Sequence, residues 1–124
     1  MSSTVELTKE NFDQTVKENG FVLIDFWASW CRPCRQFAPV YERAAQDNPD
    51  LVFGKVDTEA QPELAAAFDI RSIPTLMIVR DQVAVFAQPG ALPEAALKDV
   101  IGQARNLDMD EVRKAVAAEQ SKAE

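Results

Sequence analysis

The stretch Phe21–Cys34 reads Phe-Val-Leu-Ile-Asp-Phe-Trp-Ala-Ser-Trp-Cys-Arg-Pro-Cys, and it carries the strongest structural signal in the chain. Its first eight residues are apolar except for Asp25. A run this dense predicts a strand buried on both faces, as in a parallel or mixed sheet. Because side chains alternate along a strand, Asp25 shares one face with Leu23 and Trp27. The sequence therefore predicts a carboxylate inside the core.

A helical pattern follows the strand directly. Apolar residues recur at spacings of three and four, at Cys34, Phe37, Ala38, Tyr41 and Ala45, which predicts one apolar helix face. Cys31 then falls at or just before the first helical turn, where unpaired N–H groups and the helix dipole favour a thiolate. Pro33 suits the first turn, since its missing N–H would have no helical partner. We expect Cys31 at the surface and Cys34 more deeply buried.

The spacing of the two cysteines has three interpretations. A zinc site normally needs four ligands, and the chain has no other cysteine and no histidine, so we expect no metal. Two unreactive core thiols are a second interpretation. A redox dithiol is favoured, because the pair lies at a strand-to-helix junction. Arg32 and Arg35 add positive charge that would stabilise a thiolate at Cys31.

The next predicted strand, 51–57, brings a lysine toward the buried carboxylate. Strand, helix and strand in this order imply a right-handed crossover and parallel pairing, so Lys55 could reach Asp25. The alternative is a solvated lysine. Burial among apolar side chains should raise the pKa of Asp25 toward neutrality, which makes it a candidate proton acceptor for Cys34. A structural Asp25 paired with Lys55 is compatible with that role.

Apolar periodicity and turn residues predict the remaining elements. They are an edge strand within 2–7, a helix over 9–19 capped by Thr8, a helix starting at 61–63 with Leu64, Ala67 and Phe68 inward, a hairpin of 76–79 and 83–87 turning at 80–82, a helix over 93–104, and a helix over 109–118 capped by Asp108.

The segment Asp25–Cys34, together with Ile73-Pro74-Thr75, resembles the thioredoxin family from about Val5 to Ala104. The resemblance implies an α/β thioredoxin fold, with a central mixed sheet flanked by helices and an extra C-terminal helix. We expect a thioredoxin domain at 1–105 and a helical extension at 106–124.

The same resemblance implies a protein-disulfide reductase that works by thiol–disulfide exchange. Cys31 would be the nucleophile and Cys34 the resolving thiol, with Asp25 and Lys55 in the catalytic group and a Cys31–Cys34 redox disulfide. The resemblance also favours the Lys55–Asp25 pairing over a solvated lysine. Pro74 resembles the cis proline that faces the dithiol. The residues expected to contact clients are Trp30, Arg32, Pro33, Ile73, Pro74, Gly90 and Ala91.

Arg32 departs from the common thioredoxin pattern, which has glycine at this position. A guanidinium there should stabilise the reduced, ionised dithiol. We expect a potential somewhat less reducing than the thioredoxin value of about −270 mV. The alternative is that Arg32 selects acidic clients or a particular reductase.

Composition and charge limit the partners. The 124 residues suggest one domain, and the formal charge of −7 argues against nucleic acid and anionic membranes. No stretch reaches the length of a transmembrane helix, and no signal peptide is visible, so we expect a cytoplasmic monomer. By resemblance, it would bind no cofactor and receive electrons from NADPH through a thioredoxin reductase, then pass them to client proteins with disulfides.

Two other functions remain open at this point. The domain could be a binding or stabilising module for a partner protein, in which the dithiol is incidental. It could also be a thioredoxin-like oxidase or isomerase of an oxidising compartment, which the missing export signal disfavours.

Overall fold

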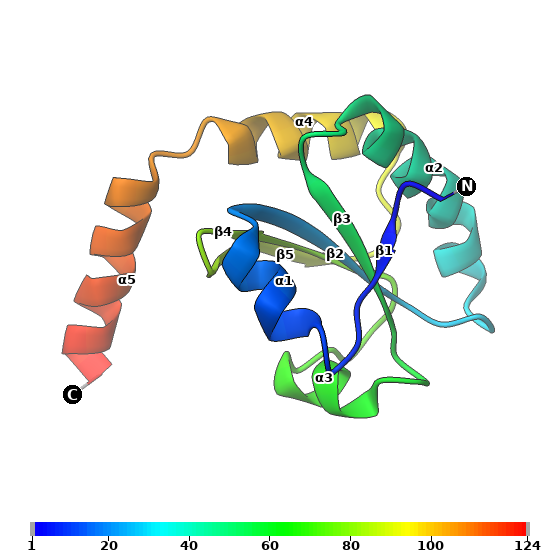
Figure 1. Ribbon diagram of the computed structural model, residues 1–124, viewed down its shortest axis with the longest axis horizontal. Coiled ribbons are helices and arrows are strands. Elements are labelled where there is room, and N and C mark those ends of the chain that lie inside the picture. The colour runs from blue at the N-terminus through cyan, green and yellow to red at the C-terminus, as the bar shows by residue number, and fades with distance from the viewer. Residues whose placement is uncertain (1, 124) are drawn as a thin grey trace.

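A five-stranded mixed sheet forms the centre of the protein. The computed structural model describes residues 2–123, and its strands lie in the order β1-β3-β2-β4-β5 (Figure 1). β1 and β3 run parallel to β2, whereas β4 runs antiparallel to both of its neighbours, β2 and β5. Their bounds are β1 Val5–Glu6, β2 Phe21–Trp27, β3 Val52–Asp57, β4 Thr75–Arg80 and β5 Val83–Pro89. The predicted parallel pairing of β2 with β3 is confirmed.

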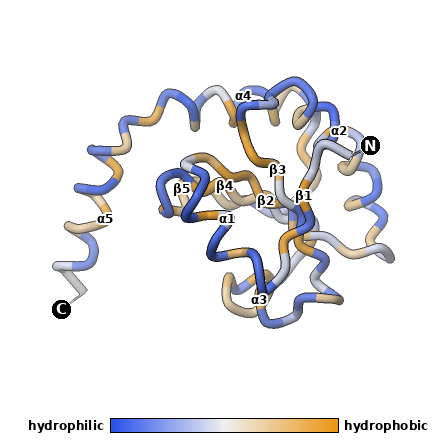
Figure 2. The backbone as a smooth tube through the Cα atoms, in the orientation of Figure 1, coloured by the Kyte–Doolittle hydropathy of each residue, from blue (hydrophilic) through white to orange (hydrophobic). Residues whose placement is uncertain are grey.

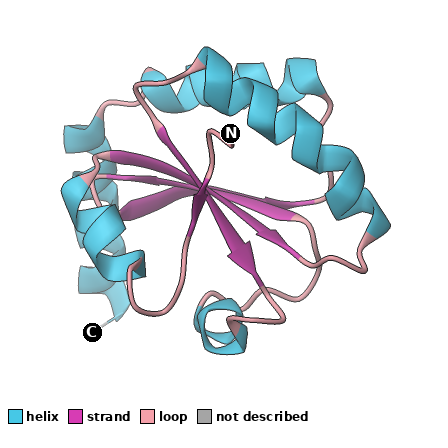
Figure 3. Ribbon diagram, turned by 45° about the vertical axis from the view of Figure 1, so that its right-hand side comes forward, coloured by secondary structure: helices cyan, strands magenta, loops and turns pink. Residues whose placement is uncertain are grey.

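Helices cover both faces of this sheet (Figure 3). α2 and α4 pack on one face, through a buried cluster that includes Phe37, Tyr41 and Leu97. α1 and α3 pack on the other face, where Phe12 is buried and Leu64 is half-buried. The helix bounds are α1 Phe12–Glu18, α2 Arg32–Asp47, α3 Pro62–Ala67, α4 Glu94–Arg105 and α5 Met109–Ala123.

β2 is the middle strand and is buried on both faces, as its apolar run predicts. Leu23 belongs to the cluster under α2 and α4, and Val22, Ile24 and Phe26 belong to the cluster under α1 and α3. Figure 2 shows hydrophobic residues concentrated along the central strands. Asp25 is therefore placed on the α2 face of the sheet, inside the core.

Two details of the predicted helices are wrong. Thr8 does not cap α1, which begins at Phe12 after Asn11. Instead, the Thr8 N–H donates to Asn11 Oδ1 at 2.7 Å, and the Thr8 carbonyl accepts from the Asn11 and Phe12 amides, so a turn occupies the expected first turn. In α3, Leu64 is half-buried as predicted, but Ala67, the last residue of the helix, is exposed and does not belong to the inner face.

The β4–β5 hairpin turns at two residues, Asp81 and Gln82, since Arg80 is still part of β4. Both have positive φ, 50° and 68°, which is the backbone of a type I′ turn and matches the twist of the strands. The Asp81 amide donates to the Gly20 carbonyl at 3.0 Å. The turn is thus anchored beside the start of β2.

α5 extends away from the body of the protein (Figure 1). Asp108 caps it as predicted, because its Oδ1 accepts from the amides of Asp110 at 3.0 Å and Glu111 at 3.3 Å. The helix reaches Ala123, five residues beyond the predicted end at 118. Met109 is buried and Val112 is half-buried. The division of the chain at residue 105 stays a prediction. Within 2–123, no helix is both long and apolar enough to cross a membrane.

Candidate active site

Cys31 and Cys34 form a disulfide at the junction of β2 and α2, with their Cα atoms 5.2 Å apart. Cys31 is the N-cap of α2, and Cys34 lies in the first turn. The Cys34 amide donates to Cys31 Sγ at 3.3 Å. The predicted strand-to-helix position of the pair is confirmed, and a backbone N–H points at the sulfur that is expected to carry negative charge.

The expected difference in exposure between the cysteines is wrong for the disulfide form. Cys31 is 4% exposed and Cys34 is 2% exposed. Both pack against Ala28, and half-buried Trp27 and Ile73 close over them. Their asymmetry comes from their positions on the helix, because only the Cys31 sulfur accepts the N–H at the helix N-terminus.

The Ile73–Pro74 loop lies against the dithiol, and its peptide bond is cis as predicted. The Ile73 carbonyl oxygen is 3.6 Å from Cys31 Sγ. The Pro74 carbonyl accepts from the Gly90 amide at 2.8 Å, and Gly90 has a φ of 104°, which favours glycine. Residues far apart in the chain therefore meet beside the reactive sulfur.

The residues expected to contact clients differ widely in exposure. Trp30 is 64% exposed, and its Nε1 donates to Glu59 Oε1 at 2.6 Å. Gly90 and Ala91 are exposed, Ile73 is half-buried, and Pro74 is buried. Pro74 therefore contributes little surface to the predicted client contacts.

The residues between and after the cysteines lie on the outer surface of α2. Arg32 and Pro33 are both exposed, at the start of the helix. The Arg35 guanidinium donates to the Ser29 carbonyl at 2.9 Å, so it braces the loop that precedes Cys31.

Asp25 is fully buried, and neither of its carboxylate oxygens has a hydrogen-bond partner within the described part of the chain. Burial raises its pKa to about 7, and the charge of Lys55 partly opposes this rise. The charge of Asp25 also acts on Tyr41 of α2. Burial is the larger cause and the Asp25 charge the smaller cause of the raised pKa of the Tyr41 phenol. Burial therefore favours the protonated form of Asp25, which lies on the face of the sheet that α2 covers.

Lys55 lies opposite Asp25 in the β2–β3 register, as predicted. The expected close ion pair is not formed, since the Asp25 oxygens accept no hydrogen bond from any described residue. Lys55 Nζ lies instead 4.8 Å from the centre of the Trp27 ring. A half-buried lysine can keep its ammonium near water over an aromatic face, whereas Asp25 is beyond the reach of water.

Glu59 is the site residue that sequence reasoning missed. It follows β3 in a polar loop and carries no motif, so only the bond to Trp30 reveals it. Within the described residues, no group of three or more His, Cys, Asp or Glu side chains is arranged to hold a metal ion.

A disulfide at a helix N-terminus, beside a cis-proline loop and above a buried carboxylate, defines a thiol–disulfide exchange protein. The profile of the Thioredoxin family matches residues 3–103. The chain belongs to the thioredoxin family, whose members are protein-disulfide oxidoreductases.

Relatives in sequence and structure agree with this assignment. The chain is 83% identical over 123 residues to the Streptomyces coelicolor protein named "Putative thioredoxin 2", covering 99% of this chain and 92% of that protein. It is 44% identical to thioredoxin 1 of Synechococcus elongatus, covering 82% of this chain and 96% of that one.

Solved structures confirm the thioredoxin fold. A point mutant of a thioredoxin from Halobacterium salinarum superposes with a TM-score of 0.78 at 32% identity, covering 86% of this chain and 96% of that chain. Thioredoxin from Plasmodium falciparum has a TM-score of 0.76 at 33% identity, covering 81% of this chain and 98% of that chain.

Proposed function

We propose that this protein reduces disulfide bonds in client proteins, with Cys31 as nucleophile, Cys34 as resolving thiol and Asp25 as proton acceptor. The observation that carries the proposal is the N-cap position of Cys31, whose sulfur accepts the Cys34 amide N–H at 3.3 Å. In the reduced protein this bond and the helix dipole favour the Cys31 thiolate, which is the form that attacks disulfides.

The first step forms a mixed disulfide. The Cys31 thiolate attacks one sulfur of the client disulfide, a Cys31–client bond forms, and the client's S–S bond breaks with release of a client thiolate. A client segment lying across Trp30, Ile73 and Gly90 would bring its sulfur beside Cys31. Exposed Arg32, Pro33 and Ala91 would complete the contact surface, with Pro74 beneath it.

The second step releases the client. The Cys34 thiol gives its proton to the Asp25 carboxylate, and the Cys34 thiolate attacks Cys31 Sγ. The Cys31–Cys34 bond forms, the mixed disulfide breaks, and the second client thiolate leaves. A pKa of about 7 suits Asp25 to this task, since a general base works best when its pKa lies near the operating pH. Lys55 would stabilise the ionised form of Asp25.

A second dithiol system must reset the oxidised protein. We propose a flavin-dependent thioredoxin reductase that draws on NADPH, with this chain holding no cofactor of its own. A reductive cycle needs a reducing compartment, which supports a cytoplasmic location. We also propose that the protein works as a monomer.

The decisive assay is NADPH-driven reduction of insulin's disulfides in the presence of a thioredoxin reductase. We expect turnover by the unaltered protein, none by Cys31→Ser, and a stalled mixed disulfide with Cys34→Ser that mass spectrometry detects. A binding module would instead keep its biological activity with both cysteines replaced by serine, and that result would overturn the proposal.

The role of Asp25 needs its own measurement. We expect Asp25→Asn to slow resolution of the mixed disulfide by about a hundredfold, in the range of general-base effects, while the initial attack changes less. Stopped-flow kinetics separate the two steps. Equal slowing of both would contradict proton transfer to Asp25.

A further inference from the structure

An apolar groove lies between β5 and α5, at the end of the sheet away from the dithiol. Val83 pairs with Arg80, which pairs with Phe21 at the start of β2, whereas the cysteines follow the end of β2. This β5–α5 groove has a volume of about 440 Å³ and is lined chiefly by Val83–Val85, Leu107, Val112 and Val116. The thiol chemistry uses none of these residues.

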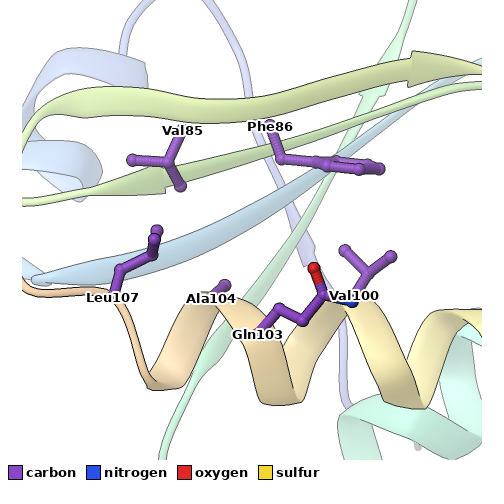
Figure 4. Close-up of a pocket in the computed structure, with 6 residues that line it drawn as sticks. All are labelled: Val85, Phe86, Val100, Gln103, Ala104 and Leu107. Atoms are coloured by element: carbon purple, nitrogen blue, oxygen red, sulfur yellow. The ribbon is translucent and has the colours of Figure 1, made fainter. Parts of the chain in front are cut away.

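The groove continues beneath α4. A smaller pocket of about 100 Å³ separates β5 from α4, and Val85 and Leu107 line both spaces. Figure 4 shows Val85 on the strand and Leu107 below it, with Val100 and Ala104 of α4 along the same side. The apolar surface therefore runs along β5, from the C-terminal half of α4 to α5.

The strand beside the groove is the edge of the sheet, because β5 is last in the strand order. Three successive residues, Val83–Val85, line the groove. Since successive side chains of a strand point to opposite faces, such a groove reaches around the strand edge. An edge strand of this kind can accept a further strand from another chain.

The charges in and around the β5–α5 groove indicate what kind of segment could bind there. Glu119 is the one charged residue among those that line the groove. The nearby cation Arg113 is held by Asp81 at 3.2 Å and by Asp110 at 2.5 Å. A second copy of this chain also carries a formal charge of −7, so the net charges of two copies repel each other and disfavour self-association. A neutral or basic occupant is favoured.

We propose that the β5–α5 groove binds an extended segment of another protein, added as a strand to β5. The segment alternates apolar and polar residues, places its apolar side chains against Val112 and Val116, and carries a lysine or arginine that meets Glu119. Because the groove is remote from Cys31 and Cys34, the segment can bind whether the dithiol is oxidised or reduced. The groove thus gives this thioredoxin a partner-docking surface separate from its client surface.

The test begins with a random-peptide phage library, selected against the full chain carrying Cys31→Ser and Cys34→Ser so that no peptide is captured through a disulfide. We expect selected peptides to share alternating apolar residues and a basic residue. A synthetic copy of one peptide should shift the NMR amide signals of Val83–Val85, and fluorescence anisotropy then gives its affinity.

Substitutions in and beside the groove test whether the selected peptide binds there. We expect Val116→Asp to weaken the peptide at least about tenfold, since it puts a charge on the apolar floor. Ala117→Asp, on the exposed opposite side of α5, should leave the affinity unchanged. Selection against Glu119→Lys should lose the preference for basic residues. Unchanged insulin reduction by Val116→Asp in the chain with both cysteines shows that the domain remains folded.

Three outcomes would overturn the proposal. One is a failure to select any peptide. Another is a set of peptides with apolar residues at helical spacing, or with an affinity that Val116→Asp leaves intact. The third is a dimer in sedimentation analysis that Val116→Asp abolishes, which would make the occupant a second copy of the chain.

Discussion

β2 and α5 both carry apolar stripes, but the structure uses them differently. In β2, every side chain from Val22 to Phe26 is buried, including that of Asp25. In α5, Met109 is buried, whereas Val112 and Val116 are only half-buried along an open groove. Helices cover β2 on both of its faces, whereas α5 contacts the rest of the protein along only one side.

An apolar pattern therefore does not by itself set the energy that a residue contributes. Burial sets it, at roughly 25 cal/mol for each Å² of apolar surface removed from water. Burial in β2 also has an unfavourable consequence, because it takes the Asp25 carboxylate away from water without a hydrogen-bond partner among the described residues. Substitutions in the two elements should therefore differ in both size and pH dependence.

The largest effect should come from Asp25→Asn in the oxidised protein. The pKa of Asp25 is raised from 3.8 to about 7, so between these values the folded protein keeps a proton that the unfolded chain releases. Stability should fall as pH rises through this window and level off above about 7, by about 4 kcal/mol in all. The amide of the variant cannot ionise, so the variant should be more stable than the parent at pH 8 and about equal near pH 4.

Urea unfolding at several pH values measures this difference. Asp50→Asn is the matched control, since the hydrogen bond from Arg105 lowers the pKa of exposed Asp50. Asp50→Asn should have a smaller effect of the opposite sign. Above the usual carboxyl pKa, the variant should be less stable than the parent, because it lacks the ionised carboxylate that Arg105 stabilises. If the free energy of unfolding changed with pH in the same way for the parent and for Asp25→Asn, the pKa of Asp25 would not be raised in the folded protein.

Leu23→Ala should come next, lowering the free energy of unfolding by about 3 kcal/mol. Leu23 is fully buried between the sheet and α2, so the change removes apolar contacts and leaves a cavity. Val112→Ala on α5 should cost less than about 1 kcal/mol, because its side chain is half-buried. Equal costs, measured by denaturant titration, would remove the contrast between the two elements.

Removing residues 109–124 should lower the free energy of unfolding by about 1–2 kcal/mol, chiefly through the loss of buried Met109. Insulin reduction should persist, because the extension lies at the end of the sheet away from the dithiol. Calorimetry and the coupled NADPH assay give the two quantities. Lost turnover in a folded truncated protein would instead place the extension in client or reductase recognition.

Arg113→Ala should have the smallest effect, below about 1 kcal/mol, because its ion pairs with Asp81 and Asp110 are solvent-exposed. Local opening of α5 should still increase, since the Asp81 contact ties the helix to the β4–β5 turn. Hydrogen exchange of the α5 amides measures this local opening, with Lys114→Ala as the control variant. Equal exchange in the two variants would show that the tie to Asp81 does not hold the helix.

Much of the site was predictable because it depends on local pattern. The apolar run of β2, the placement of Cys31 as N-cap and the capping of α5 by Asp108 all follow from residues a few positions apart. The cis bond at Pro74 followed from the resemblance to thioredoxin rather than from local pattern. The parallel pairing of β2 with β3 also follows from the order of strand, helix and strand, whereas the register that sets Asp25 opposite Lys55 comes from the structure.

Sequence patterns alone were thus enough to predict the sheet's central strand, the strand-to-helix position of the dithiol and the burial of a carboxylate near it. Tertiary packing was needed to establish that Lys55 lies over Trp27, that Cys31 is covered, and that Glu59 holds Trp30. The cause is the range over which each interaction acts. Hydrophobic periodicity and helix capping act between near neighbours in the chain, whereas these contacts depend on where distant segments pack and on which groups still reach water.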